Sequence, residues 1–221
     1  RTPGFSGADL HSIVNEAAIL AAREERVKVA QFDLIRSIEK VMLGPERKSH
    51  LLSEAEKKIT AYHEAGHALV SSVLPYADPV HKVSIIARGR AGGYTLKLPL
   101  EDRKLQSRKE FLDDIAVTLG GYITELMLFG DITTGPSNDL QVVSALARDM
   151  VTKYGMSDKL GPIAFETLLG RIGNRGVHEE KEYSQKVGDA IDVEVSKIVT
   201  KNRRLIRSVR ADSFSRTALY K

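Results

Sequence analysis

The residues His63-Glu64-Ala65-Gly66-His67 constrain this chain more than any other feature, because they form an H-E-x-x-H pattern inside a segment with helical periodicity. Two histidines at this spacing lie on one face of a helix, so both imidazoles can reach one zinc ion. The glutamate between them can hold a water molecule beside that metal and take its proton. The pattern therefore predicts a metallopeptidase site. The competing interpretation is an amphipathic helix that happens to carry two histidines.

The position of the pattern within its helix favours the metal-binding interpretation. Ser53 and Glu56 match the S-x-x-E capping box that marks a helix start. Pro75 stops the periodic run. The spacing predicts a helix from about residue 54 to residue 73, so the two histidines fall in its middle, where both imidazoles project from a regular backbone.

A catalytic zinc ion needs a third protein ligand and one position for water. The other histidines, which lie in no second motif and are interpreted as surface or packing residues, are His11, His50, His81 and His178. Asp139 is the better candidate. If Ser137 is the N-cap of the next helix, Asp139 falls in the first turn, where any carboxylate is favoured with or without a metal. Local chemistry therefore leaves both interpretations of Asp139 open.

Helices dominate the remaining predicted structure, which places the chain in the mainly α (α+β) class. The expected helices, defined by apolar periodicity and by caps at Ser6 and Ser107, cover about residues 6–24, 31–42, 108–128, 138–154 and 179–209. Strands are expected at about residues 80–87 and 94–98, and residues 44–52 are interpreted as a linker. The last dozen residues, from about 210, are expected to form a loop.

Glycines mark two places where backbones are expected to come close. Gly120 and Gly121 interrupt a predicted helix, and their cost in helix stability suggests a close approach of another helix or of the metal site. The segment Gly92-Gly93-Tyr94-Thr95 leads into a strand. Because peptidases often bind the main chain of a substrate by strand addition, we interpret Gly92, Gly93, Tyr94 and Thr95 as the substrate-binding edge. The alternative is a plain hairpin turn.

Composition excludes several classes of protein. The chain has no cysteine, which excludes disulfides and cysteine-ligated zinc and leaves histidine and carboxylate ligands. The net charge of +4 is mild, and basic residues alternate with acids along the predicted helices. No nucleic-acid partner is expected, and a nucleic-acid-binding helical domain is the weakest hypothesis. No apolar run approaches the roughly 18 residues that span a bilayer, and no signal peptide is visible.

Several segments resemble one family in the same order. Residues 60–68, with the sequence T-A-Y-H-E-A-G-H-A, resemble the protease motif of the FtsH family, the membrane-anchored AAA+ zinc metalloproteases. The other matching segments are residues 2–10, 78–83, 88–95, 134–140, 150–157 and 159–162. The resemblance covers about residues 1–200, and it departs in the loop 168–178 and from residue 201. It implies the end of an AAA+ lid at 1–44, a metalloprotease domain at 45–208 and an unassigned tail at 209–221.

The resemblance also implies the roles of the site residues. His63 and His67 correspond to zinc ligands, Glu64 to the catalytic carboxylate and Asp139 to the third ligand of one Zn²⁺ per chain. Family members often carry two adjacent acids where this chain has Glu125 followed by leucine. Glu125 is therefore expected to orient a ligand histidine through its second ring nitrogen. The alternative is an acid on the helix surface.

The family sets the wider expectations. The chain is expected to be the proteolytic part of an ATP-dependent, homohexameric protease that degrades unfolded and membrane proteins. ATP and Mg²⁺ would bind only the missing ATPase portion, because no G-x-x-x-x-G-K-[ST] loop is present. Membrane helices would precede Arg1, making this a soluble fragment of a protein of the bacterial inner membrane or an organelle membrane, with the protease on the cytoplasmic or equivalent side.

The alternative function is a non-catalytic helical assembly module with a structural or lost zinc site. A structural zinc is normally enclosed by four protein ligands. Three convincing ligands are found here, and a structural site has no use for Glu64.

Overall fold

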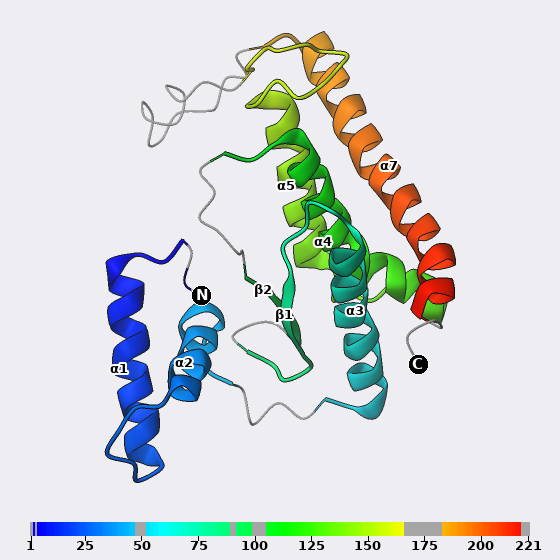
Figure 1. Ribbon diagram of the computed structural model, residues 1–221. Coiled ribbons are helices and arrows are strands. Elements are labelled where there is room, and N and C mark those ends of the chain that lie inside the picture. Colours follow the sequence, from blue (N-terminus) through cyan, green and yellow to red (C-terminus); the bar gives the residue numbers. More distant parts are fainter. Residues whose placement is uncertain are drawn as a thin grey trace. The chain divides into compact units, whose positions relative to one another are not determined.

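The computed structural model describes residues 2, 4–46, 52–88, 92–98, 105–165 and 183–217, with side chains up to residue 208. Its elements, shown in Figure 1, are α1 (Gly7–Arg23), α2 (Gln31–Leu43), α3 (Glu54–Val73), β1 (Val80–Ser84), β2 (Tyr94–Lys97), α4 (Arg108–Phe129), α5 (Ser137–Thr152) and α7 (Gln185–Thr217). The predicted mainly α class with a small β element is confirmed.

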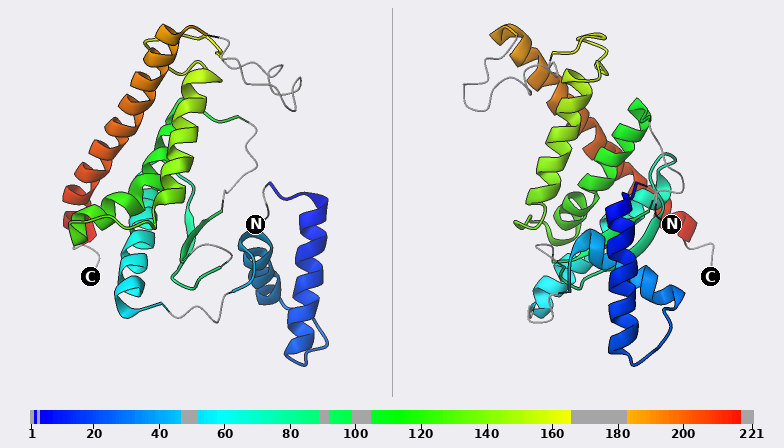
Figure 2. Two further views of the ribbon diagram at one scale, coloured as in Figure 1. Left: turned by 180° about the vertical axis from the view of Figure 1, so that it is seen from behind. Right: turned by 90° about the vertical axis from the view of Figure 1, so that its left-hand side faces the viewer.

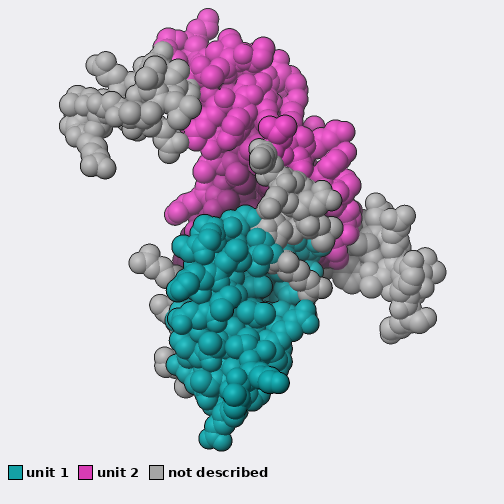
Figure 3. All heavy atoms as spheres, turned by 60° about the vertical axis from the view of Figure 1, so that its left-hand side comes forward, with its two compact units in different colours: residues 1–64, 78–103 teal, residues 65–77, 104–221 magenta. Residues whose placement is uncertain are grey.

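Two compact units divide the chain, and Figure 3 colours them separately. Unit 1 comprises Arg1–Glu64 and Asp78–Arg103, and unit 2 comprises Ala65–Ala77 and Lys104–Lys221. The division falls inside α3, so this one continuous helix contributes its first half to unit 1 and its second half to unit 2.

In unit 1, α1 and α2 lie side by side (Figure 1). The helix α1 begins with the predicted cap, because the Asp9 amide donates to Ser6 Oγ at 3.3 Å and the Ser6 amide donates to the Asp9 carboxylate at 2.9 Å. The helix α2 begins in a similar way, with the Ala30 amide donating to Asp33 Oδ2 at 2.8 Å. Both helices therefore start where the sequence predicts, since each start is set by contacts within one turn.

The sheet of unit 1 contains β1 and β2 in antiparallel register, with Val83 opposite Thr95 and Ser84 opposite Tyr94. Both predicted strands are confirmed, in shortened form. Alternate residues of β2 point to opposite faces of the sheet. Tyr94 and Leu96 are buried against Leu43 on one face, so Thr95 projects from the other.

In unit 2, α4, α5 and α7 pack against one another, as the two views of Figure 2 show. The Ser107 cap of α4 is confirmed, since the Glu110 amide donates to Ser107 Oγ at 3.3 Å. Along α4, Ile115, Leu119 and Ile123 are almost fully buried. This apolar interior is continuous with Val70 near the end of α3, so the helix that carries the H-E-x-x-H pattern is packed on the core of unit 2.

Two predictions about helix ends are wrong. Ser137 is not the cap of α5 but its first residue, because its amide donates to the Thr134 carbonyl at 3.2 Å and the turn closes one residue earlier, with Pro136 as N-cap. The expected C-terminal loop is helical as far as Thr217, since no glycine or proline interrupts residues 189–217. Most of the predicted linker 44–52 and the loop 168–178 lie outside the described residues.

Candidate metal centre

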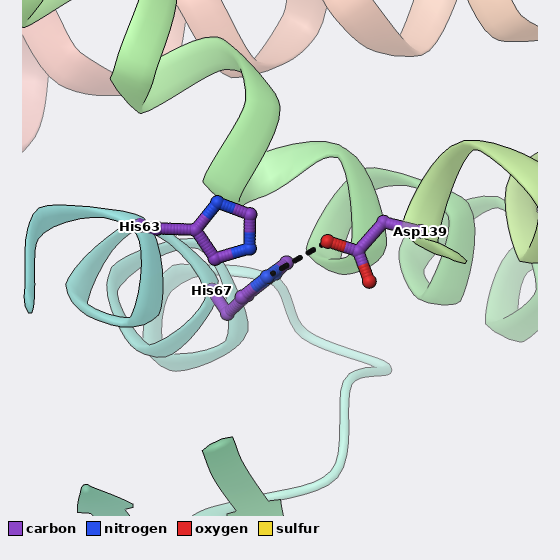
Figure 4. A group of neighbouring side chains, drawn as sticks. All are labelled: His63, His67 and Asp139. Atoms are coloured by element: carbon purple, nitrogen blue, oxygen red, sulfur yellow. Dashed lines mark ion pairs between the residues drawn. The ribbon is translucent and has the colours of Figure 1, made fainter. Parts of the chain in front are cut away.

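The helix α3 presents three residues of the predicted site. Its start carries the predicted capping box, with the Glu56 amide donating to Ser53 Oγ at 3.2 Å and the Ser53 amide donating to Glu56 Oε2 at 2.9 Å. The helix then continues without interruption to Val73. His63 and His67 therefore project from consecutive turns of one helix face, as Figure 4 shows.

Asp139 completes a cluster with the two histidines. It lies in the first turn of α5, as predicted. Its Oδ2 is 3.3 Å from Nε2 of His67. One ligand atom from each of His63, His67 and Asp139 lies within 4.8 Å of the others, and Figure 4 shows the three side chains converging. The arrangement supports the interpretation of Asp139 as a ligand over that of an ordinary helix-start acid.

One pair of ligand atoms in this cluster has the spacing that zinc requires. Two ligands at the usual zinc distances of about 2.0–2.2 Å and at a tetrahedral angle lie roughly 3.3–3.6 Å apart. The distance of 3.3 Å between His67 Nε2 and Asp139 Oδ2 falls in this range. Two imidazoles and one carboxylate also form a donor set typical of catalytic zinc, which keeps one position for water.

A hydrogen bond orients the ring of His67. Its Nδ1 is 2.8 Å from the carbonyl oxygen of Val117 in α4. A carbonyl only accepts hydrogen bonds, so Nδ1 carries a proton and donates it to Val117. Nε2 is then the ring nitrogen that faces Asp139 and the one that could bind a metal ion.

A close helix crossing places the Val117 carbonyl beside His67. A Cβ on Gly66 would lie 2.6 Å from the Gly120 carbonyl oxygen, and a Cβ on Gly120 would lie 2.8 Å from the Gly66 carbonyl oxygen. Any larger residue would push α3 and α4 apart at the turn that carries His67. The close approach predicted at Gly120 is confirmed.

Glu64 is buried next to the first ligand, with 7% of its surface exposed. The hydroxyl of Thr95 on β2 donates to Glu64 Oε2 at 2.8 Å. The side chain of the predicted catalytic carboxylate is therefore enclosed and held by a neighbouring strand. The H-E-x-x-H pattern contains no sign of this contact, because the two residues are far apart in the chain.

Glu125 is buried on α4, so its interpretation as a surface acid is wrong. Its Oε2 accepts hydrogen bonds from the amide of Thr133 at 3.0 Å and from the Thr133 hydroxyl at 2.9 Å. These bonds hold the turn that leads into α5 and thus to Asp139. The second ring nitrogen of His67 lies on the Val117 carbonyl instead of a carboxylate. That Glu125 orients a ligand histidine stays a prediction.

The predicted substrate edge has a defined packing role. A Cβ on Gly93 would lie 2.7 Å from Thr60 Cγ2, 2.9 Å from the Ser84 carbonyl oxygen and 3.0 Å from Glu64 Cγ. Glycine is therefore required where this segment passes α3, while Gly92 is exposed and Tyr94 is buried. The role of the segment in binding a substrate stays a prediction.

Two of the remaining histidines, His11 and His81, are exposed, as predicted, and neither joins the cluster. His50 and His178 lie outside the described residues.

Two histidines from one helix, an aspartate from a second helix and a buried glutamate beside the first histidine define a zinc metallopeptidase site. The comparisons agree with this class. The model of peptidase family M41 matches residues 50–213, and that of the AAA+ lid domain matches residues 1–31. The chain belongs to peptidase family M41. The predicted domain limits at residues 44 and 208 stay predictions.

Relatives with the same domain carry the name ATP-dependent zinc metalloprotease FtsH. The protein numbered 1 from Sphaerobacter thermophilus is 53% identical over 90% of this chain and 31% of its own length. The Thermotoga maritima protein is 52% identical over 90% of this chain and 33% of its own length. The Veillonella parvula protein is 46% identical over 96% of this chain and 33% of its own length. The chain thus spans about a third of the length of the curated relatives that it matches.

Proposed function

We propose that the chain is the proteolytic part of an ATP-dependent protease and cleaves internal peptide bonds of unfolded and membrane proteins. The observation that carries the proposal is the convergence of His63, His67 and Asp139 beside the buried Glu64. A non-catalytic assembly module would need neither a three-ligand metal site nor a carboxylate enclosed next to it. A structural zinc is normally enclosed by four protein ligands.

The residues of the chain have separable tasks in this reaction. When bound, zinc acidifies a water molecule and polarises the scissile carbonyl. Glu64 takes the proton of the attacking water and passes it to the leaving amine. His67 donates from Nδ1 to the Val117 carbonyl, so its Nε2 would be the atom that holds the metal. Asp139 contributes the negative charge of the ligand set and is placed by the first turn of α5.

We infer that the substrate-binding edge is formed by the segment Gly92, Gly93, Tyr94 and Thr95. β1 pairs with only one edge of β2, and no other described strand joins the sheet. An extended peptide can therefore pair with the second edge of β2 through main-chain hydrogen bonds. Recognition of the main chain suits unfolded substrates of varied sequence, because it requires few side-chain contacts.

The wider assembly is inferred from the family resemblance. We infer a homohexamer in which ATP and Mg²⁺ bind an ATPase portion outside this chain, and no nucleic-acid partner. The match to an AAA+ lid domain at residues 1–31 supports the link to an ATPase. No helix in the described parts of the chain is long and apolar enough to cross a membrane. We place the full-length protein at the bacterial inner membrane or an organelle membrane, with the protease on the cytoplasmic or equivalent side.

The test is cleavage of a fluorescently labelled, unstructured polypeptide, measured with this chain and with the ATP-supplied full-length protein. Replacing Glu64 by glutamine should lower kcat by about 10²–10⁴-fold, the usual contribution of a general base, and leave one zinc per chain. Glu54→Gln on the same helix is the matched control, because the Glu54 side chain is 90% exposed. Cleavage by neither parent protein, or equal cleavage by Glu64→Gln, would disprove the peptidase proposal.

A further inference from the structure

Thr95 contacts the carboxylate that carries out the proposed reaction. Its Oγ1 lies 2.8 Å from Glu64 Oε2 and 3.1 Å from the backbone carbonyl oxygen of Glu64. A hydroxyl has one hydrogen to donate, and the charged and closer carboxylate oxygen is the stronger acceptor. We propose that Thr95 is a positioning residue for Glu64, an assignment that rests on the proposed peptidase function.

The strand β2 and the residue just before it hold the Glu64 side chain at two points, Thr95 and Gly93. At Gly93, a Cβ would lie 3.0 Å from Glu64 Cγ. The missing side chain thus makes room for the glutamate stem, and the Thr95 hydroxyl binds its carboxylate end. A glutamate side chain has several rotamers of similar energy, and these two contacts select one of them.

The opposite face of β2 keeps Thr95 in place. Tyr94 is buried on that face, and its hydroxyl donates to Glu39 Oε2 of α2 at 3.2 Å. Glu39 also accepts hydrogen bonds from Lys82 Nζ at 2.8 Å and from Arg88 at 3.3 Å. Thr95 itself is β-branched, which restricts its χ1 angle. The hydroxyl is therefore presented to Glu64 from a strand that is anchored on both faces.

The Thr95 hydroxyl affects the reaction by orienting the Glu64 carboxylate. A hydrogen bond to one oxygen of a carboxylate sets the plane of the whole group, and so the position of the second oxygen. A general base is effective only within hydrogen-bond reach of the proton that it takes. Loss of the Thr95 hydroxyl should therefore reduce turnover, while the strand that pairs with a substrate keeps its backbone.

The experiment compares Thr95→Val with Thr95→Ser in the full-length protein supplied with ATP and zinc. Valine keeps the size and branching of threonine and removes the hydroxyl, whereas serine keeps the hydroxyl. We expect Thr95→Val to lower kcat by about 10–100-fold, the usual effect of losing a partner that orients a catalytic group, and to leave KM within about twofold. Thr95→Ser should retain most of kcat.

Two measurements separate positioning from a general disturbance. Zinc content and the visible spectrum of the cobalt-substituted protein should be the same in Thr95→Val and the parent, since Thr95 contacts Glu64 and not a ligand. Ser84→Ala is the matched control in the same sheet, because the Ser84 hydroxyl accepts from the Ile86 amide at 3.1 Å. The control should keep the kcat of the parent.

Each outcome decides the proposal. An active parent that Thr95→Val matches in kcat would overturn it. So would an equal loss in Thr95→Ser, which would show that packing, and not the hydroxyl, matters. If Thr95→Val does not fold, the kcat of Thr95→Ser relative to Thr95→Ala decides: equal values overturn the proposal and a higher value for serine supports it. A parent without any cleavage would overturn the peptidase function itself, and the positioning role with it.

Discussion

The interiors of the two units are built from different interactions. Unit 2 has a continuous apolar core that includes Ile115, Leu119 and Ile123 of α4 and residues of α3, α5 and α7. The corresponding cluster of the unit 1 sheet is small and consists of Tyr94, Leu96 and Leu98 with Leu43 beside them.

Buried acids also differ between the units. In unit 1, Asp33 is bound by the Arg26 guanidinium at 2.6 and 2.7 Å, and Glu39 is bound by Lys82 and Arg88. In unit 2, Asp113 accepts from the Tyr76 amide at 2.9 Å and Glu125 accepts from the Thr133 amide and hydroxyl. Cations therefore lie beside Asp33 and Glu39 in unit 1, whereas amides and hydroxyls bind Asp113 and Glu125 in unit 2. The contrast is one of these four acids, since Glu64 of unit 1 is bound by a hydroxyl and Glu194 of unit 2 pairs with Lys197 at 3.3 Å.

This difference shows which kind of interaction holds each part of the proposed site in place. His67 and Asp139 stand on helices packed by close apolar contact, which is sensitive to side-chain volume and insensitive to pH. Thr95 stands on a strand that is anchored through Glu39 to two cations. Its position depends on charge. The two kinds of interior should respond differently to volume changes and to acid, and the following predictions test this contrast.

The largest effect is expected from Ile115→Ala in the core of unit 2. Ile115 has no exposed surface. Removing its buried methyl and methylene groups loses transfer free energy and leaves a cavity, which should lower the free energy of unfolding by about 2–5 kcal/mol. Denaturant unfolding followed by circular dichroism measures it. Val193→Ala, at a residue with 55% of its surface exposed, should change stability by less than about 0.5 kcal/mol. Equal effects would show that unit 2 is not held by this core.

A smaller effect, but one that reaches the metal, is expected from Gly120→Ala. The new Cβ would lie 2.8 Å from the Gly66 carbonyl oxygen and 3.1 Å from the Cα of His67, and backbone atoms cannot turn away. We expect a loss of about 1–3 kcal/mol and weaker zinc binding, measured by competition with a chelator. Gly7→Ala is the control, since a Cβ there meets nothing within 4 Å. Unchanged zinc affinity in Gly120→Ala would show that the close helix crossing does not influence metal binding.

The smallest effect is expected from acid on unit 1. Hydrogen bonds from Arg26, together with the Ala30 amide, lower the pKa of Asp33 below its ordinary value of 3.8 and outweigh the raising effect of burial. The folded state therefore binds the proton less readily than the unfolded state. The stability contributed by Asp33 is fully present above the ordinary pKa and is lost as the pH falls through the lower, folded-state value.

Unfolding measured from neutral pH down to acid should show this contribution as a difference between the parent and Asp33→Asn. The difference should be constant near neutral pH and shrink below about pH 4. The loss caused by Ile115→Ala should stay constant over the same range, because Ile115 packs in a cluster of apolar side chains that carry no ionisable group. A pH-independent difference for Asp33→Asn would contradict the charge-based account of unit 1.

Helix starts could be predicted from the sequence wherever a cap is formed within one turn. Ser6, Ser53 and Ser107 each bind the amide three residues later, and all three starts are where the pattern places them. The start at Ser137 was predicted wrongly, because a turn closed by the Thr134 carbonyl competes with a side-chain cap. Such a competition depends on backbone geometry that residue types alone do not specify.

The candidate site shows the same limit. The spacing of His63 and His67 is enough to place both on one helix face, and the resemblance to a known family pointed to Asp139. Neither the Val117 carbonyl on His67 nor the Thr95 hydroxyl on Glu64 could be predicted. A backbone carbonyl has no signature in the sequence, and the segment containing Thr95 was interpreted only as a substrate edge.

The sequence by itself determined the elements and the chemistry of the zinc helix, because capping, periodicity and i, i+4 spacing act over one or two helical turns. Only the tertiary structure decided how the side chains of His67 and Glu64 are oriented. The crossing at Gly66 and Gly120 brings the Val117 carbonyl to Nδ1 of His67, and the contacts of Gly93 and Thr95 select the conformation of Glu64. Both effects join segments distant in the chain through contacts of about 3 Å, and such contacts exist only once the chain has folded.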